Sequence, residues 1–261
     1  MTITNVDRER KVIISEVDPF SIMGSLDLSV VVPVKDEAEN VIALVAEIYN
    51  AIPVELSFEV IFTDDGSGDD TLSLLLGEKS KRTNLRVLHH TNCCGQSAAL
   101  WSGFQAARGN LILTLDGDGQ NPPSEMTKLY KAYQDLGREG LVIGCRKKRQ
   151  DNLLRLFSSL FANSIRRFLL CDDNPDSGCG LKLFPKTAVR KLPYFDHMHR
   201  YFPALFQREN LPVLVVPVTH QERRGGCSKY GVWNRLWVGI YDLFGVSWLL
   251  RRRRLPLSEE A

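Results

Sequence analysis

The sequence predicts one α/β domain built on an open, mostly parallel sheet with helices on both faces. Short apolar runs rich in β-branched residues alternate four times with segments of helical periodicity, the pattern of strand–helix–strand units. The 261 residues are 44% hydrophobic and 25% charged, so the chain can bury a large core. Acidic clusters follow several apolar runs, at the sheet edge where open α/β sheets bind ligands.

The individual elements follow from the order of apolar and polar residues. Continuous apolar runs predict buried parallel strands at residues 28–34, 58–63, 85–88 and 111–115. Apolar residues three and four apart predict helices at residues 36–52, 69–80 and 97–107, the second of them capped by Asp69 or Asp70. The second half is less regular, with strands predicted at 141–144, 181–184 and 214–218 and a helix at 152–170. We divide the chain into an N-terminal extension (1–27), a main domain (28–230) and a C-terminal amphipathic segment (231–261).

Charge and cysteine content exclude several classes of protein. Lys and Arg number 33 against 31 Asp and Glu, a net charge of +2, which does not indicate a nucleic-acid binder. The six cysteines include no C-x-x-C pair, so we expect reduced thiols in a cytosolic compartment. The first 26 residues contain no apolar stretch of signal-peptide length, and we do not expect export.

Two carboxylates follow the predicted strand 111–115 directly. Alternate residues of an extended segment project to one side, so Asp116 and Asp118 can reach the same hard cation. Two carboxylates suit Mg²⁺ or Mn²⁺ with open positions for diphosphate oxygens. A D-x-D sequence alone is more often a turn or a cap, and the strand-end context favours the metal site.

Two further strand ends are acidic. Asp65 follows the strand at 58–63, and Glu37 follows the first strand after Pro33. With Asp116, these carboxylates are predicted to meet in one crevice, where their repulsion costs stability unless a cation or a base amide occupies it.

Four segments in order resemble family 2 inverting glycosyltransferases with a GT-A fold: residues 33–40 (PVKDEAEN), 64–71 (DDGSGDDT), 95–103 (GQSAALWSG) and 116–123 (DGDGQNPP). The polyprenyl-phosphate branch, which includes dolichol-phosphate mannosyltransferase and undecaprenyl-phosphate sugar transferases, is the more similar. The resemblance covers about residues 28–248 and makes 28–230 the catalytic domain. The sequence departs from the family at Lys35-Asp36 and at Gly117 and Gly119, without loss of a functional carboxylate.

The resemblance implies roles for residues at matching positions. The nucleotide sugar is expected to contact Pro33, Glu37, Asp65, Gly95 and Gln120, and a lid over its diphosphate is expected at Arg223, Ser228 and Lys229. The metal is expected at Asp116, Asp118 and Gln120. Paired basic side chains capture anions well, which supports the lid, although a Gly-Gly flanked by basic residues is often only a loop.

The spacing of Arg146, Arg155 and Ser159 resembles that used by this branch for a lipid phosphate. Arg155 and Ser159 lie four apart and so share a helix face, although a solvated basic helix has the same pattern. A phosphate monoester, with a second pKa of about 6, is already largely ionised near neutral pH and needs no strong base to attack. We therefore assign catalytic roles to Asp116, Asp118, Arg146 and Arg155, assign no general base, and give Asp176 only as a weak candidate.

His197 and His199 allow two interpretations. They could form a metal pair on a strand, but no cysteine or third histidine accompanies them, so we favour packing and hydrogen bonding, with Arg200 toward the nucleotide.

Residues 233–254 predict contact with a membrane surface. Charged residues interrupt the apolar stretch before it reaches the ~20 residues of a spanning helix. Aromatic residues nevertheless recur on one helix face, at Trp233, Trp237, Tyr241, Phe244 and Trp248. Four consecutive arginines follow at residues 251–254. A core-facing helix would also carry such a stripe, but the arginines favour an interfacial helix on a cytoplasmic leaflet, with a small membrane protein as a possible partner.

These observations lead to one functional prediction and two alternatives. The prediction is a peripheral, metal-dependent (Mg²⁺ or Mn²⁺) transferase that moves a sugar from a UDP- or GDP-sugar to dolichyl or undecaprenyl phosphate. One alternative is a family 2 enzyme with a polysaccharide or protein hydroxyl acceptor, which would need a catalytic carboxylate. The other is a non-catalytic, membrane-docked adaptor. Nucleic acid is not expected as a partner.

Overall fold

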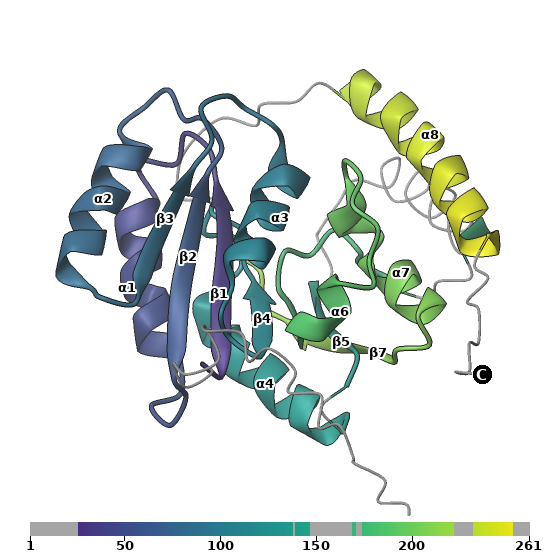
Figure 1. Ribbon diagram of the computed structural model, residues 1–261, viewed down its shortest axis with the longest axis horizontal. Helices are drawn as coiled ribbons and strands as arrows, with labels where there is room; N and C mark the ends of the chain where they lie inside the picture. Colours follow the sequence, from purple (N-terminus) through teal and green to yellow (C-terminus); the bar gives the residue numbers. More distant parts are fainter. Residues whose placement is uncertain (1–25, 138, 147–168, 171–173, 222–231, 253–261) are drawn as a thin grey trace, which may run out of the picture.

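A mixed seven-stranded sheet forms the centre of the computed structural model, which describes residues 26–137, 139–146, 169–170, 174–221 and 232–252 (Figure 1). The strand order is β3-β2-β1-β4-β6-β5-β7. The strands are β1 (Leu28–Val34), β2 (Phe58–Asp64), β3 (Leu85–His89), β4 (Leu111–Thr114), β5 (Leu141–Arg146), β6 (Lys182–Pro185) and β7 (Val213–Val218). Only β6 runs against its neighbours, β4 and β5, so the predicted open, mostly parallel sheet is confirmed.

Helices cover both faces of the sheet, as predicted. The helices are α1 (Val41–Ala51), α2 (Thr71–Lys81), α3 (Gln96–Ala106), α4 (Met126–Asp135), α6 (Lys186–Val189), α7 (Phe202–Arg208) and α8 (Val232–Arg251). Side chains of α1, α2 and α4 pack in one hydrophobic cluster, and those of α3, α6 and α7 pack in a second cluster on the opposite face. Strands β1 and β2 are buried on both faces, which explains their continuous apolar sequence.

Three helices of the second half, α4, α6 and α7, were not predicted. In α4 the signal was present: Met126, Leu129 and Tyr133 are buried at helical spacing after two prolines. The predicted strands all occur, with ends at most two residues from those predicted. The predicted helix at 152–170 lies outside the described residues except for its last two, and the N-terminal extension does so up to residue 25.

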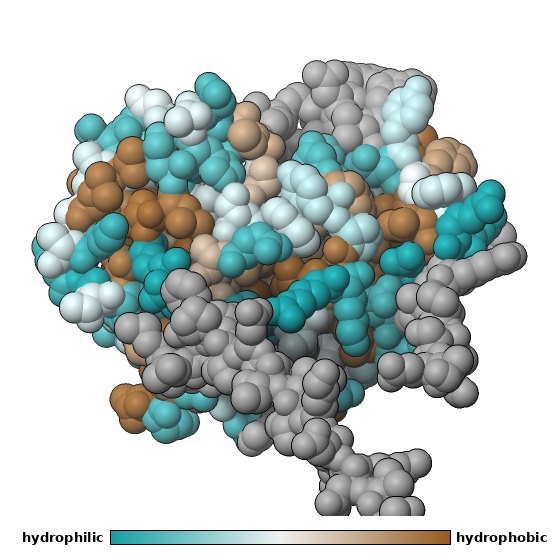
Figure 2. All heavy atoms as spheres, in the orientation of Figure 1, coloured by the Kyte–Doolittle hydropathy of each residue, from teal (hydrophilic) through white to brown (hydrophobic). Residues whose placement is uncertain are grey.

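Helix α8 packs against α7 at one end of the molecule (Figure 1). Val246 and Ser247 are buried on its inner side. Tyr241, Phe244 and Trp248 are 75%, 62% and 61% exposed on its outer side. Hydrophilic residues adjoin apolar ones at this edge of the molecule (Figure 2). Within the described ranges, no helix has the length and hydrophobicity needed to cross a bilayer.

The candidate active site

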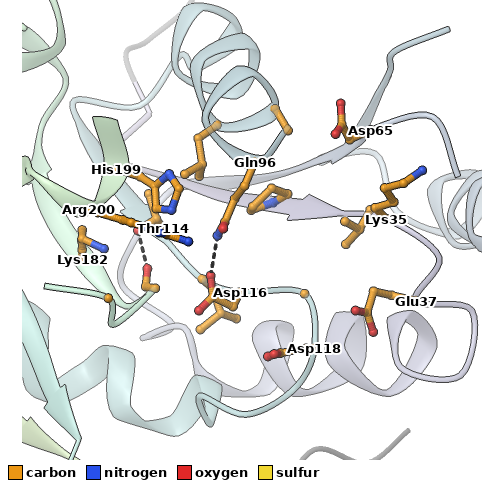
Figure 3. A pocket seen from close by; sticks show the side chains of 18 of the residues that line it. Lys35, Glu37, Asp65, Gln96, Thr114, Asp116, Asp118, Lys182, His199 and Arg200 are labelled. Carbon is orange, nitrogen blue, oxygen red and sulfur yellow. Dashed lines mark hydrogen bonds between the residues drawn. The ribbon is translucent and has the colours of Figure 1, made fainter. Parts of the chain in front are cut away.

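A cavity of about 430 Å³ opens at the carboxyl ends of β1, β2 and β4. These strands are parallel neighbours, so the loops that follow them lie side by side. The loops bring five of the predicted site residues into the lining: Pro33, Glu37, Asp65, Asp116 and Asp118 (Figure 3). The predicted convergence of acidic strand ends on one crevice is therefore present in the structure.

Asp116 lies between amide donors and other charges. Its Oδ1 accepts a hydrogen bond from Gln96 Nε2 (3.0 Å), and its Oδ2 accepts one from Asn121 Nδ2 (3.2 Å). Burial raises the pKa of Asp116 to about 6, and the negative charge of Asp118 adds to the rise, against the opposing charge of Lys182. Carboxylates that repel each other in this way form a site that a cation would stabilise.

Asp118 is held by its own loop. Its Oδ1 accepts a hydrogen bond from the backbone N–H of Gln120 (3.1 Å). Gln120 also accepts, through its backbone oxygen, a bond from the N–H of Gln221 (2.9 Å). Gln120 is not among the residues that line the cavity, so its observed contribution is through the main chain.

Asp65 is 4% exposed and is surrounded by donors. It accepts hydrogen bonds from the backbone N–H of Cys94 (2.9 Å) and of Gly95 (2.8 Å), and it lies 2.8 Å from His90 Nδ1. Burial alone would raise the pKa of Asp65, but these hydrogen bonds outweigh burial and lower the pKa. Gly95 has a φ of +93°, which favours glycine, and it stands directly before α3. Its observed contact is with Asp65 rather than with the cavity.

Glu37 is tied to the start of α1. Its Oε2 accepts a bond from Asn40 Nδ2 (2.6 Å), and its backbone N–H donates to Thr71 Oγ1 (2.8 Å) at the start of α2. Asp69 accepts a bond from the N–H of Thr71 (3.0 Å), so of the two predicted capping residues it is Asp69 that binds the first turn of α2.

Arg146 forms a two-pronged ion pair with Asp176. Its Nε and Nη2 each lie 2.7 Å from a different oxygen of that carboxylate. This hydrogen bonding, despite burial, raises the pKa of Arg146, and the guanidinium in turn lowers the pKa of Asp176 against the effect of burial. Arg146 does not line the cavity but lies beside Gly178, which does. The other predicted residues of the acceptor site and the lid lie outside the described residues: Arg155, Ser159, Arg223, Ser228 and Lys229.

The two histidines bind different partners. His199 Nδ1 lies 2.7 Å from Ser97 Oγ, and His197 Nδ1 lies 3.1 Å from Asp242. This agrees with packing and hydrogen bonding rather than with a metal pair. Both residues belong to a short 3₁₀ turn and the residue before it, not to the strand that we considered.

Sequence reasoning did not select four polar residues that also line the cavity: Lys35, Gln96, Thr114 and Lys182. Lys182 is 3% exposed. A charged residue within an apolar strand was the available signal for Lys182, because such a residue is rarely buried without a partner. Arg200, which we expected toward the nucleotide, also lines the cavity, but it lies near Lys182 and His199 rather than near Glu37 and Asp65 (Figure 3).

Comparison with known proteins assigns the family. Residues 29–193 match the model of glycosyl transferase family 2, which is more than half of the chain. The chain belongs to this family, and the resemblance drawn from its four motifs is confirmed.

Two relatives show which members are similar. The chain is 33% identical over 239 residues to a dodecaprenyl-phosphate galacturonate synthase of Rhizobium johnstonii, covering 89% of this chain and 70% of that protein. It is 31% identical over 221 residues to an undecaprenyl-phosphate 4-deoxy-4-formamido-L-arabinose transferase of Edwardsiella ictaluri, covering 83% of this chain and 66% of that protein. The chain thus spans about two thirds of the length of these relatives.

Solved structures agree on the fold. Glucosyl-3-phosphoglycerate synthase from Mycobacterium tuberculosis, in complex with Mn²⁺, UDP-glucose and phosphoglyceric acid, has a TM-score of 0.59 at 17% identity, covering 86% of this chain and 79% of that one. A further mycobacterial protein has a TM-score of 0.61 at 18% identity, covering 84% and 75%. These similarities confirm the GT-A architecture.

Proposed function

We propose that this chain transfers a sugar from a UDP- or GDP-sugar to a polyprenyl phosphate at the cytoplasmic face of a membrane, with inversion at the anomeric carbon. The proposal rests on one observation: acidic residues that follow three neighbouring parallel strands, β1, β2 and β4, line the same cavity. Both relatives described above are named for a polyprenyl-phosphate product or acceptor, which supports the same substrate class here.

A divalent cation fits the donor set at Asp116 and Asp118. The raised pKa of Asp116 reflects burial next to a like charge, an arrangement that Mg²⁺ or Mn²⁺ would relieve. Such a cation would stabilise the charge that develops on the leaving diphosphate. Asp116 is already oriented by Gln96 and Asn121, and Asp118 by the main chain of Gln120.

The donor nucleotide is assigned to the other end of the cavity. Glu37 and Asp65 lie there with Pro33, and the hydrogen bonds that keep Asp65 ionised make it an acceptor for ribose hydroxyls or base amides. The lid residues Arg223, Ser228 and Lys229 and the backbone around Gly95 remain part of this proposal.

The acceptor supplies its own nucleophile. An oxygen of the ionised phosphate forms a bond to the anomeric carbon while the bond from that carbon to the diphosphate oxygen breaks, so no proton has to be removed first. Arg146, fixed by Asp176, would hold the acceptor phosphate together with Arg155 and Ser159. A hydroxyl acceptor would instead need a carboxylate free to take a proton.

Residues 233–254 are proposed to rest on the membrane surface. The helix α8, with its exposed aromatic face, ends at Arg251, and the guanidinium of the next residue, Arg252, lies 5.9 Å from the ring centre of Trp248. Aromatic rings at headgroup depth beside arginines are typical of interfacial helices. A small membrane protein could occupy part of the same surface.

The proposal is tested by product analysis. The full chain is incubated with Mn²⁺, a short-chain polyprenyl phosphate and a panel of radiolabelled UDP- and GDP-sugars. Label that moves into organic solvent, and is released by mild acid as free sugar, supports the proposal. Label that stays with water-soluble polysaccharide or protein favours the hydroxyl acceptor, and no transfer together with no nucleotide binding favours the adaptor.

A further inference from the structure

The cavity has two ends of different charge. Glu37 and Asp65 lie at one end together with Lys35, whose amine donates to the backbone oxygen of Gly66 (2.8 Å), and Lys182, His199 and Arg200 gather at the other (Figure 3). The three basic residues come from β6 and from the turn before α7. The nucleotide is assigned to the acidic end, so the basic end faces whatever lies beyond the diphosphate.

Lys182 is a buried cation with unused donors. Its amine donates a hydrogen bond to the backbone oxygen of Cys179 and lies 6.0 Å from the ring centre of Phe202. No other hydrogen-bond acceptor for this amine occurs in the described part of the chain. An ammonium group has three N–H donors, so two of them remain at a position that lines the cavity. Burial of such a group is costly unless an anion compensates it, and the carboxylates of Asp116 and Asp176 act on Lys182 through their charge without accepting a hydrogen bond from it.

Arg200 and His199 add donors at the same end. Across the described ranges, the guanidinium of Arg200 has no hydrogen-bond or ion-pair partner, although it lines the cavity. His199 uses Nδ1 on Ser97, and its Nε2 has no partner in the same ranges. Arg146, in contrast, is already saturated on one edge by Asp176. Lys182 and Arg200 are therefore the cations of this region that are available to a ligand.

We propose that Lys182 and Arg200 form an oxyanion-binding subsite at the end of the cavity opposite the nucleotide. The inference rests on the proposed function and adds residues to it. A planar guanidinium beside a compact ammonium suits an anionic oxygen group. Two groups of the reaction have this chemistry: the phosphate monoester of the acceptor lipid, and the carboxylate of an acidic sugar on the donor.

The test compares Lys182→Met and Arg200→Gln with Lys131→Gln, a control that removes an exposed cation on α4. Binding of a short-chain polyprenyl phosphate in detergent and of UDP and GDP with Mn²⁺ is measured for each folded protein. Michaelis constants are then compared for UDP-sugars with and without a carboxylate. Loss of one charge-assisted hydrogen bond of about 1.5–3 kcal/mol corresponds to roughly a 10- to 150-fold weaker interaction.

We expect Lys182→Met and Arg200→Gln each to weaken binding of the anionic ligand by this factor, and Lys182→Arg to restore part of it. Binding of UDP and GDP should stay within about twofold of the wild type. Weaker binding of the lipid phosphate assigns the subsite to the acceptor, whereas a raised Michaelis constant only for carboxylate sugars assigns it to the donor. Unchanged values for both ligands, or a parallel loss of nucleotide binding, would overturn the proposal. If Lys182→Met does not fold, Arg200→Gln decides alone. Phosphate binding through Lys182 without any transfer to lipid would contradict the proposed function and leave this inference standing.

Discussion

Gly180 packs directly against the carboxylate of Asp116, so that a methyl group at position 180 would overlap all three atoms of that carboxylate. The two residues are 64 positions apart and meet because β6 is inserted beside β4. The absence of a side chain at position 180 therefore sets where the first carboxylate of the proposed metal site lies.

The first prediction follows from this contact. Gly180→Ala should displace Asp116 and reduce Mn²⁺ affinity and transfer by at least about tenfold, as measured by calorimetry and by lipid-extractable label. Gly77→Ala is the control, because a methyl group there meets nothing within 4 Å. The control should keep full activity and gain about 0.5–1 kcal/mol of stability from its position within α2. Equal activity in the two variants would show that the Asp116 position is not critical.

The second prediction concerns the pH dependence of stability. The pKa of Asp116 is raised from 3.8 to about 6, so the folded protein without metal binds this proton more tightly than the unfolded chain does. Stability from this group is present at low pH and is lost as pH rises from about 4 to about 6. Asp116→Asn should therefore stabilise the metal-free protein at pH 7.5, by up to about 3 kcal/mol, and change it little at pH 4.

Urea denaturation in EDTA at the two pH values measures this difference, with the exposed Asp135→Asn as control. A variant less stable than the wild type at pH 7.5 would contradict the raised pKa. In the wild type, Mn²⁺ affinity should fall as pH drops below about 6, because a protonated carboxyl is a poor ligand.

The third prediction separates chemistry from folding. Asp118→Ala removes a carboxylate whose hydrogen bond is to the main chain of Gln120, so the variant should keep its fold. Transfer should fall at least about 100-fold, since a bound cation contributes several kcal/mol to the transition state. Circular dichroism and transfer of labelled sugar measure the two properties. Full activity on a polyprenyl phosphate would refute the metal assignment.

The fourth prediction concerns α8. Replacement of Tyr241, Phe244 and Trp248 by serine removes exposed apolar surface and should leave the core unchanged. Partition onto vesicles with anionic lipids should weaken at least tenfold, because each ring loses favourable burial at the interface. Vesicle sedimentation measures it.

The matched control for α8 is Ile42→Ser with Leu76→Ser, which removes two exposed apolar side chains of α1 and α2. This variant should bind vesicles as the wild type does. Equal binding by all three proteins would mean that the membrane contact lies elsewhere.

The sequence by itself determined the sheet and its acidic edge. Buried parallel strands are continuous apolar runs, and the residue that follows each run must lie at the carboxyl edge, so local pattern was enough to bring Glu37, Asp65 and Asp116 to one crevice. The tertiary structure alone decided the opposite side of the cavity. Which residues beyond 140 face Asp116 depends on the insertion of β6 in the reverse direction between β4 and β5. That strand order depends on packing between segments far apart in the sequence, which local periodicity does not record. It places Lys182 in the cavity lining and pairs Arg146 with Asp176.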